Sequence, residues 1–107
     1  MEQFAGQIAR IPPNHPESER SVLGAMLRSN EAALLAIESL AAADFYDPAN
    51  REIFQAMASL AASNRPIDIV TLDDQLSKKG RLDAVGGTGY LIELSAGVPS
   101  AANAAAY

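Results

Sequence analysis

The fold is decided by residues 66–103, which read PIDIVTLDDQLSKKGRLDAVGGTGYLIELSAGVPSAAN. Asp68 can accept the free backbone N–H groups at the start of a helix, and Ile67 and Leu72 are spaced as a hydrophobic staple around that start. Gly80 can take the left-handed conformation that ends the same helix. These signals start and stop helices, and none of them is a catalytic motif.

Two points in this stretch remain open from the sequence. Thr71 with Asp74 is a competing capping box, so the helix start is uncertain by one turn. Residues 67–70 could form a strand by propensity, but the capping signals favour a helix. Further on, residues 86–89 form a turn that leads into a short helix carrying Leu91 and Leu94.

The N-terminal half contains three further predicted helices. Pro16 suits the first turn of a helix, with Asn14 or His15 at its cap. Asn30 can cap the second helix. Its apolar face is predicted to consist of residues with helical spacing, namely Leu34, Leu35, Ile37 and Leu40. Asp47 followed by Pro48 starts the third helix.

These patterns predict a compact all-α domain, an orthogonal bundle of five to six short helices. We expect a flexible N-terminal arm over 1–14, a globular helical domain over 15–98 and the start of a truncated helical hairpin over 99–107. The predicted structural caps are Asp47, Asp68 and Gly80. The predicted core consists of Leu23, Leu27, Ile53, Phe54, Met57, Leu72, Leu76, Leu91 and Leu94.

Composition excludes several classes of protein. The chain of 107 residues fits one domain, and it contains no cysteine, which rules out a disulfide framework and a thiolate metal site. No apolar run approaches the roughly 20 residues needed to cross a bilayer, and the N-terminus has no secretory pattern. The net charge of −5 disfavours non-specific DNA binding, which depends on Lys and Arg neutralising phosphates. We therefore expect protein partners, with weak or absent DNA contact.

The sequence offers no convincing catalytic or metal site. Tyr90 and Leu91 follow the glycines at 86–89, where a phosphate-binding loop needs Lys and then Ser or Thr. His15 with Glu17 and Glu19 is better explained as a solvated helix start than as a metal cluster, because no second His is present. We predict no catalytic residue, no metal ligand and no cofactor for this chain.

Surface candidates are few. Lys78, Lys79 and Arg81 are the densest basic group, and a solvated helix end explains them. Phe45 and Tyr46 could stack on nucleic-acid bases or lie at a protein interface. Possible interface residues are Phe45, Tyr46 and Tyr90. An alternative hypothesis is a small DNA-binding regulator of the helix-turn-helix type, with its turn at 64–68.

Several segments in order resemble the N-terminal domain of the DnaB-type replicative DNA helicase. The first segment is residues 15–27 with Glu19, and the middle segment contains residues 44–46 and 53–60. The last runs from residue 66 to residue 103, including Gly80, residues 86–87 and residues 90–91. One departure is Asn50, where that family often has His. No single segment is specific to this family, but the order of the segments is.

The resemblance implies a collar domain of a hexameric ring helicase that unwinds DNA at the replication fork. In that family ATP and magnesium belong to a RecA-like C-terminal domain, so this chain is not expected to be an enzyme. The family's N-terminal domains pair through a helical hairpin and dock primase. The implied partners are other helicase protomers, primase and a helicase loader, in the cytoplasm of a bacterium or in a phage replisome.

Overall fold

The computed structural model describes residues 15–97, and this part of the chain is helical. Five α-helices are joined by short connections: α2 (Pro16–Arg28), α3 (Asn30–Ser39), α4 (Pro48–Ala62), α5 (Ile69–Lys78) and α6 (Gly87–Ala96). Two 3-10 turns, η1 (Ala42–Asp44) and η2 (Asp83–Val85), precede α4 and α6. Residues 15–97 contain no strand, so the predicted all-α class is confirmed. The predicted arm and hairpin start lie outside the described residues.

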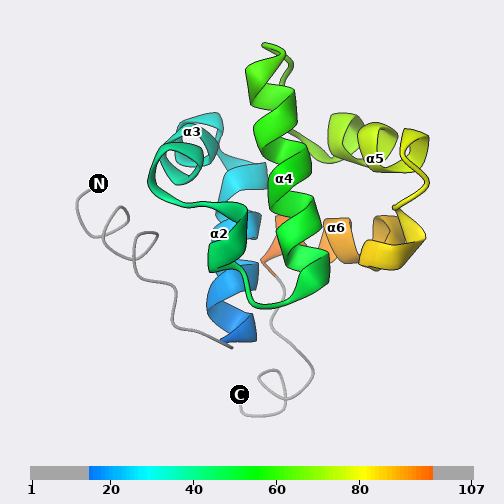
Figure 1. The fold of residues 1–107 in the computed structure, drawn as a ribbon, viewed down its shortest axis with the longest axis horizontal. Helices are drawn as coiled ribbons and strands as arrows, with labels where there is room; N and C mark the ends of the chain where they lie inside the picture. The colour runs from blue at the N-terminus through cyan, green and yellow to red at the C-terminus, as the bar shows by residue number, and fades with distance from the viewer. Residues whose placement is uncertain (1–14, 98–107) are drawn as a thin grey trace.

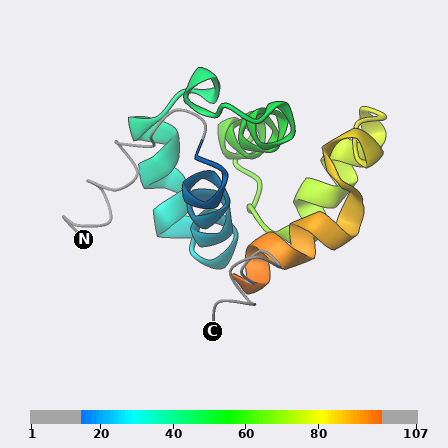
Figure 2. The ribbon, with the colours of Figure 1, turned by 90° about the horizontal axis from the view of Figure 1, so that it is seen from below.

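The helices are arranged around α4, which runs through the middle of the domain (Figure 1). In that view α2 and α3 lie on one side of α4, and α5 and α6 lie on the other. The turned view shows the end of α6 beside α2 (Figure 2), and these two helices are in direct contact. The contact between α2 and α6 joins the two sides of the domain. Helix α4 itself packs against α2 on one side and α5 on the other.

Local side chains determine where the helices begin. Asp47 caps α4 by accepting the N–H of Ala49 at 2.8 Å, as predicted from its position before Pro48. Asp68 caps α5: its Oδ1 accepts the Thr71 N–H at 2.9 Å, and Thr71 Oγ1 accepts the Asp68 N–H at 3.1 Å. The capping box is therefore the pair Asp68–Thr71, and residues 69–70 belong to the helix.

The start of α2 decides between its two predicted caps, and the start of α3 corrects the predicted one. His15 is the cap of α2, because its Nδ1 accepts the N–H of Ser18 at 3.3 Å. For α3 the predicted cap was one residue too late. Ser29 Oγ accepts the N–H of Ala32 at 3.2 Å, and Asn30 is the first residue inside the helix.

Two helices end in the same way, with one residue in the left-handed conformation. Gly80 has a φ of 69° and follows α5, where the N–H of Arg81 donates to Leu76 O at 2.9 Å. Asn64, with a φ of 58°, follows α4, and the N–H of Arg65 donates to Leu60 O at 2.9 Å. Both are Schellman motifs, which satisfy backbone carbonyls that the helix leaves free.

One apolar core joins all five helices. Its members from α2 and α4 include Leu23, Leu27, Ile53, Phe54 and Met57, and those from α5 and α6 include Leu72, Leu76, Leu91 and Leu94. These are the nine residues named from the sequence, and each has an exposed fraction of 9% or less. The core also contains Phe45, whose ring centroid lies 4.9 Å from that of Phe54.

Helix α3 packs with a face that only partly matches the one predicted. Its buried side chains are the alanines at 32, 33 and 36, together with Leu40 just after the helix. Of the predicted face, Leu40 belongs to the core and the half-buried Ile37 packs against it. Leu34 is 46% exposed, and Leu35 is half-buried but does not belong to the core. The alanines allow α3 to approach α2 closely, and Leu34 and Leu35 are turned outward.

The approach of α2 to α6 depends on Gly24. A Cβ at this position would collide with the carbonyl oxygen of Leu94, which belongs to the backbone of α6. Nearby, Nη1 of Arg28 donates to Leu94 O at 3.2 Å and to Ser95 O at 3.1 Å. The guanidinium therefore binds carbonyls of the last turn of α6, at the negative end of the helix.

Candidate interaction surface

The loop before α4 is held on both sides by charged side chains. Glu19 on α2 accepts the N–H of Tyr46 at 2.5 Å and the N–H of Asp47 at 3.3 Å. On the other side, Arg51 donates from Nε and Nη2 to Phe45 O at 3.2 and 3.1 Å. These bonds fix the backbone of the loop, so its side chains are presented in one arrangement.

The same carboxylate begins a buried polar chain across three helices. Asn50 Nδ2 on α4 donates to Glu19 Oε1 at 2.9 Å, and Tyr90 OH on α6 donates to Asn50 Oδ1 at 2.5 Å. Glu19 and Asn50 are each only 1% exposed. Within residues 15–97, every buried side-chain nitrogen or oxygen has a hydrogen-bond partner. A buried charge is tolerated here because several donors surround it.

The phenol of Tyr90 is kept in its neutral form by this environment. Burial raises the pKa of Tyr90 to about 12, and the nearby carboxylates of Asp47 and Glu19 act in the same direction. Arg20 and the hydrogen bond with Asn50 oppose the rise. The hydroxyl is protonated at neutral pH even at the ordinary pKa of 10.0, and the raised pKa keeps it available as the donor to Asn50 in more alkaline solution.

The three predicted interface residues lie in different environments. Phe45 has an exposed fraction of 0%, so it is a core residue and not an interface residue. Tyr90 is half-buried and its hydroxyl is bound to Asn50. Tyr46 is 61% exposed, on the backbone that Glu19 and Arg51 hold. Of the three, Tyr46 is the residue that offers a large surface to a partner.

Sequence reasoning missed the two central members of the polar chain. Glu19 was interpreted as a solvated charge at a helix start, and it is instead buried. Asn50 was noted only as a departure from a family pattern, yet it joins Glu19 to Tyr90. The available signal was weak: a carboxylate three residues before an apolar run, on the side of α2 that carries Val22 and Leu23.

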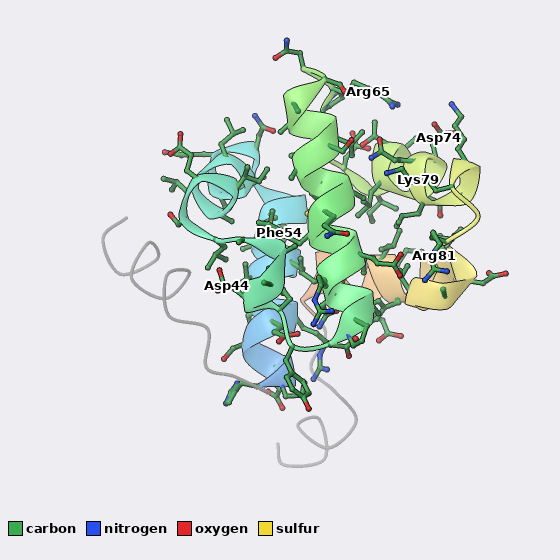
Figure 3. All side chains as sticks on the ribbon, in the orientation of Figure 1. Asp44, Phe54, Arg65, Asp74, Lys79 and Arg81 are labelled. Carbon is green, nitrogen blue, oxygen red and sulfur yellow. The ribbon has the colours of Figure 1, made fainter. Side chains whose placement is uncertain are left out.

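Two of the three basic side chains at the end of α5, Lys78 and Arg81, are bound to neighbouring carboxylates. Arg81 forms two bonds of 2.8 Å with Glu52, and Lys78 Nζ lies 3.1 Å from Asp74. The hydrogen bond from Arg81 lowers the pKa of Glu52. Figure 3 shows Arg65, Asp74, Lys79 and Arg81 along one edge of the domain. Because acidic groups are interspersed, this edge is not a strongly positive surface.

The described residues offer no constellation typical of a metal site. Across residues 15–97, no three His, Cys, Asp or Glu side chains come together as a possible metal-binding group. His15, the histidine of the suspected cluster, contacts the hydroxyl of Ser18 at 2.7 Å. None of the helices between residues 15 and 97 has the length and apolar character needed to cross a membrane.

Four large apolar side chains remain exposed within residues 15–97. They are Leu34 on α3, Tyr46 before α4, Val70 on α5 and Ile92 on α6. Single exposed apolar residues are normal, so each requires a second observation before it indicates binding. Tyr46 has the rigid loop described above. Leu34 has an outward-facing half-buried neighbour in Leu35.

Comparison with known sequences gives a consistent set of relatives. A family model described as the DnaB-like helicase N terminal domain matches residues 11–107. The chain is 43% identical over 98 residues to the replicative DNA helicase DnaB of Treponema pallidum, and 42% identical over 98 residues to that of Geobacillus stearothermophilus. Each match covers 92% of this chain and 22% of the relative, so the chain spans about a fifth of their length.

A solved structure has the same fold. The crystal structure of the N-terminal domain of DnaB helicase from Mycobacterium tuberculosis superposes with a TM-score of 0.76 at 40% sequence identity. The superposition covers 91% of this chain and 67% of that one. The arrangement of α2 to α6 is therefore shared with a relative of substantial sequence identity.

Proposed function

Because the chain belongs to the family of DnaB-like helicase N-terminal domains, we propose that it is the non-catalytic collar domain of a hexameric replicative DNA helicase. In this role it mediates association between helicase protomers and docks primase. ATP-dependent DNA unwinding resides in the RecA-like C-terminal domain of the full-length helicase, which also binds ATP and magnesium. The protein acts in the cytoplasm, within the replisome.

The observation that carries this proposal is the family match over residues 11–107. It is supported by relatives that are replicative DNA helicases at 42–43% identity. The chain corresponds to about a fifth of those proteins, which agrees with a division of labour between an N-terminal docking domain and a separate motor. Fold alone would not support a function, but identity at this level over most of the chain does.

Charge supports protein contact over DNA contact. The net charge is −5, and cations such as Arg81 and Lys78 are engaged with carboxylates. A DNA-binding surface needs Lys and Arg that are free to neutralise phosphates. We expect fluorescence anisotropy with a labelled DNA duplex to show only weak binding at physiological salt. Tight binding with a steep salt dependence would instead favour a DNA-binding regulator.

The position of Tyr46 in the structure also supports the docking role. Its side chain is 61% exposed on a loop whose backbone is bound by Glu19 and Arg51. A large aromatic side chain on a rigid segment loses little conformational entropy when a partner covers it. Tyrosine is also among the residue types that dominate binding energy at protein interfaces.

The docking role is tested by isothermal titration calorimetry with the C-terminal domain of primase. The 107-residue chain and a longer form that includes the helical hairpin are each titrated with it. Binding by the longer form, with weaker or no binding by the shorter one, is expected if the hairpin completes the site. Absence of heat with both forms would refute primase docking.

Protomer association is tested separately by light scattering on the same two forms. The longer form is expected to be a dimer or a higher oligomer, because the family resemblance attributes pairing to the hairpin. A longer form that stays monomeric at high concentration would contradict the association role. This result would leave the calorimetric test of primase docking unaffected.

A further inference from the structure

Helix α3 presents an apolar stripe to solvent, framed by two carboxylates. We name the α3 outer face by its four residues, Glu31, Leu34, Leu35 and Glu38. They follow the spacing i, i+3, i+4, i+7, which places them on one side of a helix. Leu34 is 46% exposed, Leu35 is half-buried, and both glutamates are exposed.

This arrangement departs from that of an ordinary surface helix at Leu34 and Leu35, although Ile37 and Leu40 pack on the core. A helix at the edge of a domain normally turns its leucines to the core and its small or polar residues to water. Here the alanines at 32, 33 and 36 are buried, with exposed fractions of 8%, 0% and 0%. Burying a leucine stabilises a protein more than burying an alanine does, so Leu34 and Leu35 forgo part of that stabilisation within the domain. A partner that covers them recovers it.

The charge along the segment that contains the stripe is of one sign, between Arg28 and Arg51. From Ser29 to Asn50 the chain contains four acidic residues, at 31, 38, 44 and 47, and no Lys, Arg or His. This segment therefore has a formal charge of −4 out of the −5 of the whole chain. The cations Arg65, Lys79 and Arg81 lie across the domain, beyond α4, whereas Asp44 lies on the α3 side (Figure 3).

We propose that the α3 outer face docks a basic amphipathic helix of a partner protein. The partner helix places apolar side chains on Leu34 and Leu35, with Lys or Arg opposite Glu31 and Glu38. This proposal assigns a surface to the docking role and rests on that role. Helices that pack side by side interdigitate residues at this spacing, and flanking opposite charges fix the register.

Charge argues against a second copy of this chain as the occupant. In a two-fold antiparallel pairing of α3 with itself, Glu31 would face Glu38 of the second copy, and a parallel pairing would align identical glutamates. Like charges face each other in both arrangements, and no cation between residues 29 and 50 offsets them. Nucleic acid is disfavoured for the same reason.

The contact is small. Helix α3 has 10 residues, so its outer face offers much less area than a standard protein interface. We therefore expect it to bind a helix weakly by itself and to act together with other contacts. NMR is the suitable method, because amide chemical shifts report weak binding that calorimetry misses.

The probes are two designed helical peptides with the same leucine stripe. One carries Lys on both sides of the stripe, and the other carries Glu at the same positions. Each is titrated into the 15N-labelled chain. The Lys peptide is expected to shift amides of residues 30–41 and to bind roughly fivefold to tenfold more tightly than the Glu peptide, as two exposed charge pairs allow. Equal binding of both peptides, no binding, or shifts centred elsewhere would overturn the proposal.

Two charge-reversed variants distinguish binding that depends on the α3 outer face from binding that depends on the net charge of the chain. Glu31→Lys with Glu38→Lys is expected to reverse the preference, so that the Glu peptide binds more tightly. The control, Glu17→Lys with Glu93→Lys, makes the same change in net charge at two exposed sites outside α3, and it should keep the Lys preference. If the control also reverses the preference, binding depends on overall charge and the proposal falls.

A primase titration of the longer form, which includes the helical hairpin, distinguishes this inference from the proposed function. Leu34→Ser is expected to weaken binding of the primase C-terminal domain while leaving the helical circular dichroism spectrum unchanged. If primase binds the wild type and Leu34→Ser equally, docking stands and the assignment to α3 is wrong. If primase binds neither protein while the Lys peptide still binds α3, the surface stands and the proposed partner is wrong. A concentration-dependent dimer that Leu34→Ser abolishes would show a second copy as occupant and refute the proposal.

Discussion

Asn50 and Glu19 form a buried hydrogen bond between α4 and α2, with Asn50 Nδ2 donating to Glu19 Oε1 at 2.9 Å. Both side chains are 1% exposed, and the same carboxylate also accepts backbone N–H groups from Tyr46 and Asp47. One charged group thus connects α2, the loop that carries Tyr46 and the first turn of α4. Removing the Glu19 carboxylate is therefore expected to change both the stability of the domain and the position of Tyr46.

Glu19→Gln tests this carboxylate. The substitution keeps the shape but removes the charge, and it turns an amide NH2 toward groups that are themselves donors. We expect the free energy of unfolding to fall by about 1.5–3 kcal/mol, the range for hydrogen bonds to charged groups. Urea denaturation followed by circular dichroism measures it. Glu17→Gln on the exposed side of α2 is the control, with an expected change within about 0.5 kcal/mol. Equal effects of the two variants would mean that the buried carboxylate adds no stability.

Tyr90→Phe tests the far end of the polar chain. The variant removes one neutral hydrogen bond to Asn50, and we expect a loss of about 0.5–1.5 kcal/mol at neutral pH. Tyr46→Phe is the matched control, because the Tyr46 side chain is largely exposed, and its stability should be unchanged. A Tyr90→Phe protein as stable as the wild type would show that water replaces the hydroxyl at no cost in stability.

The raised pKa of Tyr90 has a consequence for stability in alkali. Its folded pKa of about 12 lies above the ordinary value of 10.0 for a tyrosine, so the unfolded chain loses the phenol proton first as pH rises. The contribution of the neutral phenol is fully present below pH 10 and is lost as the pH rises toward 12. We expect wild type to lose more stability than Tyr90→Phe across this window. Absorbance of phenolate at alkaline pH should show a late-titrating tyrosine that is missing in Tyr90→Phe. If the wild type has no late titration, the hydroxyl is accessible to solvent.

How far the sequence predicted these features depended on the separation of the interacting residues. Asp47 and Asp68 were predicted as caps because each bonds a backbone N–H two or three residues further on. The partners of Glu19 lie 27, 28 and 31 residues away. No local pattern contains that information, so Glu19 was expected to be solvated. The burial of Phe45 was missed for the same reason, since its contact with Phe54 forms only when the loop folds back onto α4.

Helix α3 shows a different limit. Periodicity correctly indicated a helix, but α3 carries apolar residues on two faces. Side-chain size favoured a core face that includes Leu34 and Leu35. The structure instead buries the alanines together with Ile37 and Leu40, because short side chains let α3 lie close to α2. The orientation of a helix with two apolar faces is determined by its neighbours, which the sequence pattern does not describe.

Phe54→Ala tests the core that the sequence did predict. Phe54 is 3% exposed and packs against Phe45 with an interplanar angle of 33°. Truncation of a buried phenylalanine costs about 3–5 kcal/mol, and we expect a loss in this range by urea denaturation. Phe45→Ala should cost a similar amount, and the double variant should lose less than the sum by roughly 0.5–1.5 kcal/mol because the ring pair is already broken. A loss below about 1 kcal/mol for Phe54→Ala would contradict its burial in the core.

Gly24 and Gly89 give opposite predictions for the same substitution. Alanine is favoured over glycine inside helices by up to about 1 kcal/mol, so propensity alone predicts that both Gly→Ala variants are stabilised. At Gly89 a Cβ meets nothing within 4 Å, and we expect Gly89→Ala to raise the free energy of unfolding by about 0.5–1 kcal/mol. At Gly24 the Cβ would meet the backbone oxygen of Leu94. The α2–α6 contact must then open, and we expect a net loss of about 1–3 kcal/mol. Chemical denaturation of both variants measures the difference. A stabilised Gly24→Ala would mean that α6 can move away from α2 without loss, which is incompatible with a contact that holds the two sides of the domain together.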